Sequence, residues 1–276
     1  MNLINIESSR IVQEITKTPM TFPILMVQND SSDLSRTGRV NSLETFASVD
    51  GPGVRFAIFL QGCRMRCKYC HNPNTWAIDS GDEMTVGEIL DRAENYRPYW
   101  GKHGGITVSG GEPLLQIDFL ISLFREAKRR NIGTCIDTSV QPFKDDPSYL
   151  ETFDLLMSYT DILLVDIKHI DPDAHKELTG WDNSNIMRCL RHLSDIGKPV
   201  WIRYVLVPGH TDDIEDLKHT REFLDTLSNI EKVDILPYHT LGVHTSASLG
   251  LEYRLQGVEP PTSDEIRSAS SILKDV

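Results

Sequence analysis

Short apolar runs alternate with longer segments of helical period from about residue 54 to the end of the chain. Six of these runs are rich in β-branched and aliphatic residues and have the length of strands. They cover residues 54–60, 105–109, 133–137, 161–167, 200–207 and 232–238. Strands that alternate with helices are typical of βα units, so the sequence predicts a parallel sheet.

The segments between the runs have the spacing of amphipathic helices. The clearest of them begins near Ile117 and repeats apolar residues at i, i+3, i+4 and i+7 as far as Phe124. Other helices are expected at residues 85–97, 147–158, 185–197, 213–227 and 263–274. Thr85 followed by Glu88 has the pattern of a capping box. Together the elements predict an α/β fold, an incomplete (β/α)6 TIM-like barrel.

Residues 1–36 differ from the rest of the chain. They show little periodicity and end in the polar stretch QNDSSDLSRTG, so we interpret them as an N-terminal extension. The barrel domain is then expected to comprise residues 37–276. The first residues lack the pattern of a secretory signal, and Glu7 and Glu14 argue against an organelle transit peptide. A cytoplasmic protein is therefore expected.

Composition excludes several classes of function. The 276 residues carry a formal net charge of −12, and their basic residues form no cluster suited to phosphate groups. We therefore expect no nucleic-acid partner. No apolar run reaches the roughly 18 residues that a membrane span needs, so no membrane association is expected either. Three of the five cysteines lie within eight residues, which is unlike a secreted disulfide scaffold and fits a reducing compartment.

The clustered cysteines are Cys63, Cys67 and Cys70, in the stretch GCRMRCKYCHN. The spacing C-x3-C-x2-C places three soft thiolates in one loop, which suits an iron-sulfur cluster. Three ligands for four irons would leave one iron open. The alternative is a zinc ion held by the same cysteines and His71, although adjacent ligands such as Cys70 and His71 are poorly placed for one tetrahedral ion.

Polar residues follow the ends of the other predicted strands. They are Gly110, Gly111 and Glu112 after the second, Asp137 and Thr138 at the third, Asp166 and Lys168 at the fourth, Arg203 in the fifth and His239 after the sixth. In barrels of parallel strands, functional residues gather at the carboxyl ends of the strands. The sequence therefore predicts that these side chains and the three cysteines lie together on one rim.

The cysteine motif, with Tyr69 before its third cysteine and a GGE motif after the next strand, resembles the radical S-adenosylmethionine superfamily. The stretches VDGPGVRF, QGCRMRCKYCHN, TVSGGEPLLQ, TCIDT, VDIKHI, VWIRYVLVPG and LPYHTLG resemble, in order, activating enzymes of glycyl-radical proteins of the pyruvate formate-lyase type. This resemblance implies a [4Fe-4S] cluster at Cys63, Cys67 and Cys70. It also implies reductive cleavage of S-adenosylmethionine to methionine and a 5′-deoxyadenosyl radical, which removes a Cα hydrogen from a glycine of the partner lyase. The alternatives are activation of another glycyl-radical enzyme and a radical reaction on a small molecule.

The resemblance also implies roles for single residues. Gly110, Gly111 and Glu112 would meet the methionine ammonium, and Lys168 would meet its carboxylate. Tyr69, His71, Asp137, Asp166 and His239 would lie around the same cofactor. Each has an ordinary alternative: a GGE stretch is often only a loop, Lys168 could be a solvated lysine, and a histidine at a strand end is often only packed.

A cation and two partner proteins complete the expectations drawn from the resemblance. Asp137, Thr138 and Asp166 would hold a monovalent cation, since hard oxygen ligands suit such an ion; the alternative is that they cap helices. The glycine loop of pyruvate formate-lyase would contact Asp50, His71, Arg203 and His239. Asp50 also belongs to a DGPG turn signal. A flavodoxin or ferredoxin would supply the electron.

Two features separate this chain from relatives. No cysteine occurs between Cys70 and Ser109, where other activating enzymes commonly carry a cysteine-rich insert. Ser139 and Val140 stand where the resembling enzymes usually have Asn and Gly, so the turn is not expected to use a glycine conformation. The remaining thiols, Cys135 and Cys189, lie in apolar patterns and are interpreted as core residues.

Overall fold

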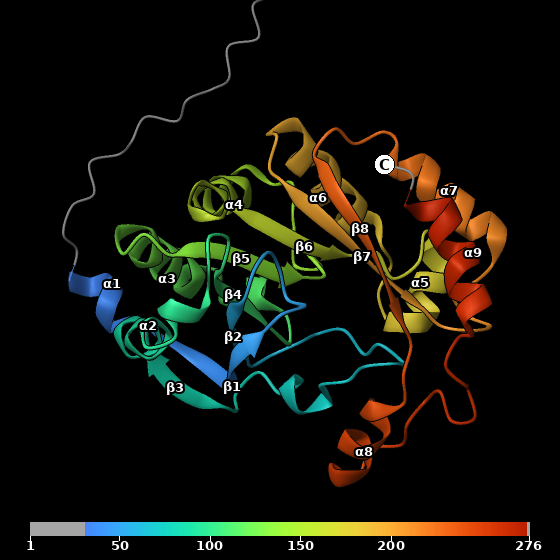
Figure 1. Cartoon of the computed structure of the whole chain (residues 1–276), viewed down its shortest axis with the longest axis horizontal. Coiled ribbons are helices and arrows are strands. Elements are labelled where there is room, and N and C mark those ends of the chain that lie inside the picture. Colours follow the sequence, from blue (N-terminus) through green and yellow to red (C-terminus); the bar gives the residue numbers. More distant parts are fainter. Residues whose placement is uncertain (1–30, 275–276) are drawn as a thin grey trace, which may run out of the picture.

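An eight-stranded sheet lies at the centre of the computed structural model, which describes residues 31–274 (Figure 1). Its strands are β1 (Thr37–Ala47), β2 (Arg55–Leu60), β3 (Asp82–Thr85), β4 (Gly105–Gly110), β5 (Gly133–Thr138), β6 (Ile162–Asp166), β7 (Val200–Leu206) and β8 (Ile230–Pro237). Their spatial order is β3-β1-β2-β4-β5-β6-β7-β8. The two outer strands of this order do not pair with each other in the described region, so the sheet is an incomplete barrel, as predicted.

The six predicted strands correspond to β2 and β4 to β8, and these pair in parallel. They are easy to recognise because both faces of such strands are covered, which selects continuous apolar runs. In β6, for example, the run from Ile162 to Val165 is fully buried. The parallel arrangement brings the carboxyl ends of the six strands to one rim, where the predicted site residues lie.

Two strands of the sheet were not predicted. β1 pairs antiparallel with β2, with Val40 opposite Leu60, and β3 pairs antiparallel with the other edge of β1. In β1 only the positions around Gly38 and Val40 are buried and most other side chains are partly or fully exposed. This strand therefore lacks the continuous apolar run of the central strands. Its first residue is Thr37, where the sequence analysis placed the start of the barrel domain.

Helices cover the outer face of the curved sheet (Figure 1). They are α1 (Ser31–Ser35), α2 (Val86–Glu94), α3 (Ile117–Arg129), α4 (Pro147–Tyr159), α5 (Pro172–Thr179), α6 (Ser184–Asp195), α7 (Ile214–Leu224), α8 (Leu241–Ser248) and α9 (Ser263–Leu273), with short 3-10 turns at Pro73–Thr75, Arg97–Tyr99 and Pro113–Gln116. The capping box of Thr85 and Glu88 forms as predicted. α5 and α8 were not predicted, and α8 lies apart from the other helices (Figure 1).

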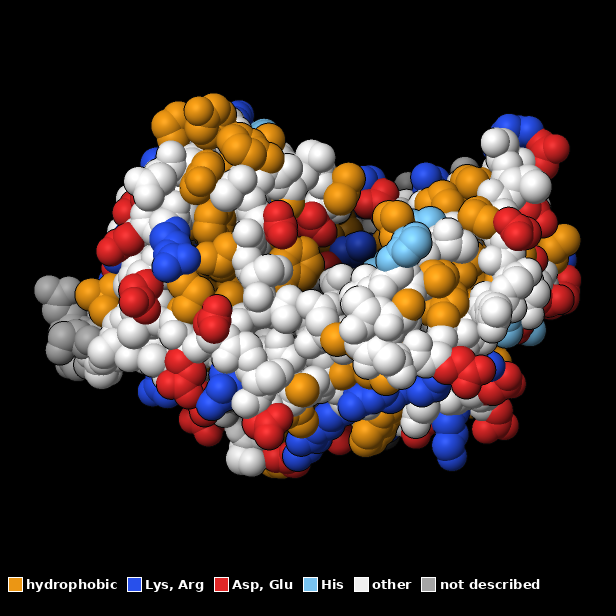
Figure 2. All heavy atoms as spheres, turned by 90° about the horizontal axis from the view of Figure 1, so that it is seen from below, with side chains coloured by type: hydrophobic (Ala, Val, Ile, Leu, Met, Phe, Trp, Pro, Cys, Tyr) orange, Lys and Arg blue, Asp and Glu red, His pale blue; other side chains and the backbone are white. Residues whose placement is uncertain are grey.

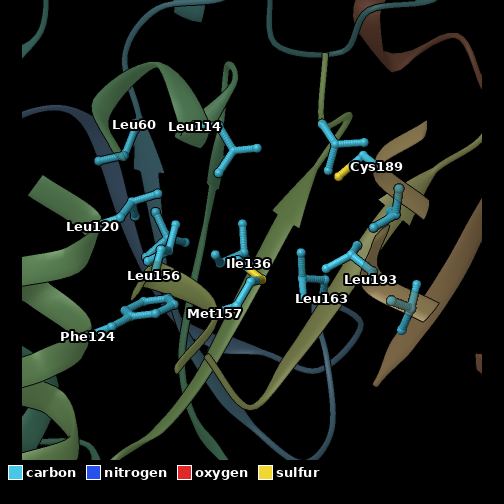
Figure 3. Packing of buried hydrophobic residues seen from close by; sticks show 14 of the residues in the cluster. Leu60, Leu114, Leu120, Phe124, Ile136, Leu156, Met157, Leu163, Cys189 and Leu193 are labelled. Atoms are coloured by element: carbon cyan, nitrogen blue, oxygen red, sulfur yellow. The ribbon is translucent and has the colours of Figure 1, made fainter. Parts of the chain in front are cut away.

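The main core lies between the sheet and the helices α3, α4 and α6 (Figure 3). Leu120 and Phe124 of α3 face the sheet together with Leu156 of α4, and all three are fully buried. Burying one such side chain stabilises a fold by about 2 kcal/mol, so this layer fixes the strands that carry the rim. Cys189 of α6 packs in the same cluster, as predicted for a core thiol.

The segment interpreted as an extension lies mostly outside the described residues. Its described part includes α1, which packs near α3 through a buried ion pair. Asp33 is 3% exposed, and its carboxylate lies 3.0 Å from Nη1 of Arg125 and 3.7 Å from Nη1 of Arg129. Within residues 31–274, no helix is long and apolar enough to cross a membrane.

Candidate active site

A cavity of about 430 Å³ opens at the carboxyl ends of the parallel strands. The predicted residues that line it are Cys63, Cys67, Tyr69, Cys70, His71, Gly110, Gly111, Asp137, Thr138, Asp166, Lys168, Arg203 and His239. Figure 2 shows a hollow near the middle of one face, with acidic, basic and histidine side chains around it. The topology therefore brings together residues that are as far apart in the sequence as Cys63 and His239.

The cavity with the predicted residues is not the largest one. A second cavity of about 490 Å³ lies at the opposite end of the strands and is lined by Arg55 and Trp100 among others, but by none of the predicted site residues. The five N–H groups of Arg55 are bonded to the hydroxyl of Thr107 and to four backbone carbonyls. Arg55 thus ties the ends of neighbouring strands together, which is a structural role.

The loop of residues 61–72, which we call the cysteine loop, is held on both sides. On one side, the backbone N–H groups of Arg66 and Lys68 donate to the carbonyls of Thr179 (2.8 Å) and Leu178 (2.9 Å) at the end of α5. On the other side, α8 packs against the loop at Gly242, where a Cβ atom would lie 2.6 Å from the carbonyl oxygen of Cys70. The helices α5 and α8, neither of which was predicted, therefore both position the cysteines.

Burial changes the acidity of the thiols in the cysteine loop. Burial raises the pKa of Cys63 to about 12 and that of Cys67 to about 11, so a metal must displace their protons when it binds. Throughout the described part of the chain, no three His, Cys, Asp or Glu side chains converge closely enough to hold one ion. The zinc alternative with His71 as fourth ligand is therefore not supported by the geometry.

His71 instead stacks on His239 across the cavity wall. Their ring centroids lie 3.9 Å apart, with an angle of 11° between the planes. Burial, with a smaller contribution from His239, lowers the pKa of His71 to about 4, so its ring is neutral at physiological pH. Two histidines from distant parts of the sequence thus form one stacked pair beside Cys70.

Lys168 is a buried cation beside the cysteine loop. It is 9% exposed, its Nζ atom lies 3.1 Å from Oδ2 of Asp166, and it lies 5.7 Å from the centroid of the Tyr69 ring. Burial disfavours its charge, but the neighbouring acidic groups, of which Asp166 contributes most, together outweigh that effect and hold the pKa of Lys168 well above its usual value. A permanent positive charge therefore faces the cavity.

Asp137 forms the second ion pair of the cavity. Its Oδ2 atom lies 2.6 Å from Nη1 of Arg203 and accepts a hydrogen bond of 2.9 Å from the hydroxyl of Ser109. Burial raises the pKa of Asp137, and Arg203 opposes that shift. The two cations Arg203 and Lys168 thus stand beside the two acids Asp137 and Asp166 on adjacent strands.

Asp50 lies just behind the cavity wall. Its backbone carbonyl accepts a hydrogen bond of 2.6 Å from the hydroxyl of Thr107, and its neighbour Val49 lines the cavity. Burial raises the pKa of Asp50, while the positive charge of Arg203 lowers it. Asp50 is therefore within electrostatic reach of Arg203, although its side chain is not part of the wall.

Glu112 is placed differently from the expectation. It is 1% exposed and does not line the cavity. Its carboxylate accepts hydrogen bonds from the hydroxyl and N–H of Ser139 (2.5 and 3.0 Å), the hydroxyl of Thr138 (2.5 Å) and the N–H of Leu114 (3.1 Å). Burial raises the pKa of Glu112, while these hydrogen-bond donors lower it. The carboxylate is fully used in fixing the turn after β5, so only the backbone of Gly110 and Gly111 faces the cavity.

The turn after β5 corrects one expectation. Val140 adopts φ +49°, a left-handed conformation, even though it is not a glycine. A β-branched residue in this region is strained by about 1–3 kcal/mol. The N–H of Val140 donates to the hydroxyl of Thr138 (2.8 Å), and its side chain is fully buried, so local hydrogen bonds and packing hold the strained turn. Ser139, which the sequence reasoning missed, could have been noticed as a hydroxyl directly after a rim strand.

Comparisons with known proteins agree with this site. A family model described as the Radical SAM superfamily matches residues 57–224. The pyruvate formate-lyase-activating enzyme of Streptococcus mutans is 54% identical over 86% of this chain and 91% of its own length. That of Staphylococcus epidermidis is 50% identical over 84% of this chain and 93% of its own length.

Solved structures also resemble the fold. A domain of a pyruvate-formate lyase-activating enzyme from Bacteroides vulgatus has a TM-score of 0.51 and 27% identity, over 62% of this chain and 92% of that one. A radical SAM methyltransferase from Sphaerobacter thermophilus has a TM-score of 0.58 at 18% identity, over 79% of this chain and 63% of that one, which supports the fold alone. The chain belongs to the radical S-adenosylmethionine superfamily and, within it, to the family of pyruvate formate-lyase-activating enzymes.

Proposed function

We propose that this enzyme activates pyruvate formate-lyase by generating a glycyl radical on it. The observation that carries the proposal is the identity of 54% to an activating enzyme of this kind, over 86% of the chain. Family membership implies a [4Fe-4S] cluster and S-adenosylmethionine. When bound, they supply the chemistry, in which reductive cleavage gives methionine and a 5′-deoxyadenosyl radical that abstracts a glycine Cα hydrogen.

The cysteine loop would hold the cluster. Cys63, Cys67 and Cys70 all line the cavity, and thiolates are the ligands that iron-sulfur clusters require. Three cysteines leave one iron to face the cavity. The loop is tied to α5 and α8, so the three sulfurs are held in one place before the cluster binds.

The cavity wall would bind S-adenosylmethionine through charges that already exist in the protein. Lys168 offers a desolvated positive charge to the methionine carboxylate. The backbone of Gly110 and Gly111 would meet the ammonium group, and Glu112 would act indirectly by fixing the turn behind them. Tyr69 and the stacked rings of His71 and His239 provide flat apolar surface for the nucleoside.

A monovalent cation at Asp137, Thr138 and Asp166 remains part of the proposal. The three residues line the same stretch of the cavity and offer oxygen ligands of the kind that such an ion prefers. The guanidinium of Arg203 is paired with the carboxylate of Asp137 in this structure. The ion would therefore have to share that carboxylate or displace the guanidinium. Binding of the ion is thus expected to change the position of Arg203.

The glycine loop of the lyase would enter the cavity beside Asp50, His71, Arg203 and His239. Support comes from the open sheet, which leaves the cavity accessible, and from Val49, which lines it and is 76% exposed. Val49 would then pack against the entering loop and lose its exposure to water.

We also propose that a flavodoxin or ferredoxin in the cytoplasm supplies the electron. Arg64, Arg66 and Lys68 all lie in the cysteine loop, although the whole chain carries −12. Arg64 is exposed, and positive charge near a redox centre steers an acidic donor toward it. We further propose that residues 37–276 form the catalytic domain and that residues 1–36 extend from it.

Electron paramagnetic resonance tests the function directly. Reduced, cluster-loaded enzyme is mixed anaerobically with S-adenosylmethionine and pyruvate formate-lyase, and a glycyl radical signal is expected on the lyase. The matched control is Cys67→Ser, which removes one proposed ligand. If the intact cluster cleaves S-adenosylmethionine but no glycyl signal forms, pyruvate formate-lyase is not the substrate.

A further inference from the structure

Glu112 connects the cysteine loop with the turn after β5. Its backbone N–H donates to the carbonyl of Gly62 at 2.7 Å, directly before Cys63, and the N–H of Gly111 donates to the carbonyl of Leu60 at 2.9 Å. The two backbones lie close together, because a Cβ atom on Gly111 would overlap the carbonyl oxygen of Gly62. The backbone before Glu112 is therefore fixed to the start of the cysteine loop.

The carboxylate of Glu112 reaches the turn after β5, where Ser139 binds it twice. The hydroxyl of Ser139 donates to Oε2 at 2.5 Å, and its backbone N–H donates to the same oxygen at 3.0 Å. The hydroxyl of Thr138 donates to Oε1 at 2.5 Å. The N–H of Gln141 donates to the hydroxyl oxygen of Ser139 (3.3 Å), which orients that hydroxyl toward Glu112. Ser139 thus supplies two hydrogen bonds to one carboxylate oxygen.

This network is shielded from water. Glu112 is 1% exposed, and Ser139, which lines the cavity, is 8% exposed. Water therefore cannot simply replace a lost donor, and a buried charged acceptor that loses a donor is destabilised. Without the hydroxyl of Ser139, Oε2 of Glu112 would keep the N–H of Ser139 but lose its shortest hydrogen bond. The carboxylate would then turn toward the cavity, and the backbone of Gly111 would shift with it.

We infer that Ser139 is a positioning residue for S-adenosylmethionine, which acts through Glu112 on the two glycines before it. In the proposed function, the backbone of Gly110 and Gly111 meets the methionine ammonium. Ser139 holds this backbone in a fixed place relative to Cys63, because Glu112 is bonded to both segments. The inference rests on the proposed function, since it requires that the cavity binds S-adenosylmethionine.

The variant Ser139→Ala tests this by equilibrium dialysis of S-adenosylmethionine against the cluster-loaded enzyme. Binding should weaken about tenfold, because one hydrogen bond to a buried charge is lost. Ser139→Thr keeps the hydroxyl and should bind like the wild type. The matched control is Ser148→Ala, since Ser148 is exposed and its hydroxyl also donates to a carboxylate, that of Asp146 (2.8 Å), but outside the cavity. Wild-type affinity in Ser139→Ala overturns the inference.

A double-mutant cycle shows whether Ser139 acts through Glu112. If it does, Ser139→Ala should weaken binding about tenfold in the wild-type background and hardly at all in a Glu112→Ala background. A residue that only stabilises the fold would have the same effect in both backgrounds. Equal effects in the two backgrounds therefore overturn the inference.

Amide hydrogen exchange of the cluster-free protein tests the link without the cofactor, and also when Glu112→Ala does not fold. The N–H of Glu112, which is bonded to Gly62, should exchange about tenfold faster in Ser139→Ala than in the wild type or in Ser148→Ala. Unchanged exchange at Glu112, or equally faster exchange at all amides, overturns the inference and leaves the proposed function standing. A cluster-loaded wild type that binds no S-adenosylmethionine would instead reject the proposed function, and the inference with it.

Discussion

Arg203 of β7 and Asp137 of β5 form an ion pair across the intervening strand β6, with 2.6 Å between Nη1 and Oδ2, in the wall of the cavity. Their side chains are 18% and 12% exposed, so neither charge is well solvated. Such a pair matters for stability mainly because removing one partner leaves the other charge buried and unpaired. This relationship gives the first prediction.

Arg203→Met should destabilise the enzyme by about 3 kcal/mol near neutral pH. Burial already raises the pKa of Asp137, and loss of Arg203 raises it further. The pKa of Asp137 is then higher in the folded protein than in the unfolded one. The contribution of Asp137 to stability is therefore present at low pH and is lost as the pH rises through the folded-state pKa. The deficit relative to wild type should therefore be larger at pH about 7.5 than at pH about 5 in urea unfolding.

The control for this variant is Arg39→Met. Arg39 pairs with Glu83 at 2.9 Å, but the two side chains are 39% and 59% exposed, so the change should stay within about 0.5 kcal/mol. A deficit in Arg203→Met that does not change with pH would show that Asp137 does not carry the effect.

Cys67→Ala and Cys135→Ala should behave differently. Cys67 lines the cavity, whereas Cys135 is fully buried in β5. The first variant should lose bound iron and cleavage of S-adenosylmethionine together, while the second should keep both and lose about 1 kcal/mol of stability from a small cavity. Iron content and absorbance after anaerobic reconstitution measure this. Equal losses in both variants would mean that the ligands are assigned wrongly.

Lys168→Met should weaken binding of S-adenosylmethionine by roughly 10- to 100-fold. The change removes a charged hydrogen-bond donor worth about 1.5–3 kcal/mol, while the side chain keeps a similar length. Anaerobic equilibrium dialysis of the cluster-loaded enzyme gives the dissociation constant. The matched control is Lys198→Met, since Lys198 donates to the carbonyl of Thr160 (2.7 Å) and does not line the cavity. Unchanged affinity in Lys168→Met would remove this residue from the binding site.

Gly242→Ala should push α8 away from the cysteine loop. Its Cβ atom would lie 2.6 Å from a backbone oxygen of Cys70, a contact that requires a shift of the helix or of the cysteine loop. We expect a loss of about 1–3 kcal/mol in thermal unfolding and lower cluster retention during gel filtration.

Gly87→Ala in α2 is the comparison for that change. Its nearest neighbour would be 3.5 Å away, and alanine favours a helix by about 0.5–1 kcal/mol over glycine. A variant Gly242→Ala that is as stable as Gly87→Ala and retains the cluster equally well would contradict the proposed support by α8.

The fold was predictable where burial of a whole strand selects a continuous run of apolar residues in the sequence. The run that became β6 is buried throughout, so its sequence alone identifies a central strand. β1 is mostly half-buried, and its pairing with β2 becomes visible only in the folded sheet. α8 presents Leu241 to solvent with 69% exposure and is positioned by Gly242 against Cys70, so tertiary contact rather than local periodicity determines it.

The site was predictable as a set of residues but not in their orientation. The rule that functional residues gather at the ends of parallel strands placed Asp137, Lys168 and Arg203 on one rim, and all three line the cavity. It could not show that Glu112 turns away toward Ser139, because that direction depends on the strained turn at Val140.

The burial of the two remaining thiols also determines which cysteines are oxidised in air. Cys135 and Cys189 are fully buried, and burial raises the pKa of Cys135 to about 12 and that of Cys189 well above its usual value. Thiols in this state are slow to oxidise or to exchange disulfides. When oxygen destroys the cluster, oxidation of thiols should therefore be confined to the cysteine loop. A mild reductant followed by iron and sulfide should then be sufficient to repair the enzyme without unfolding it.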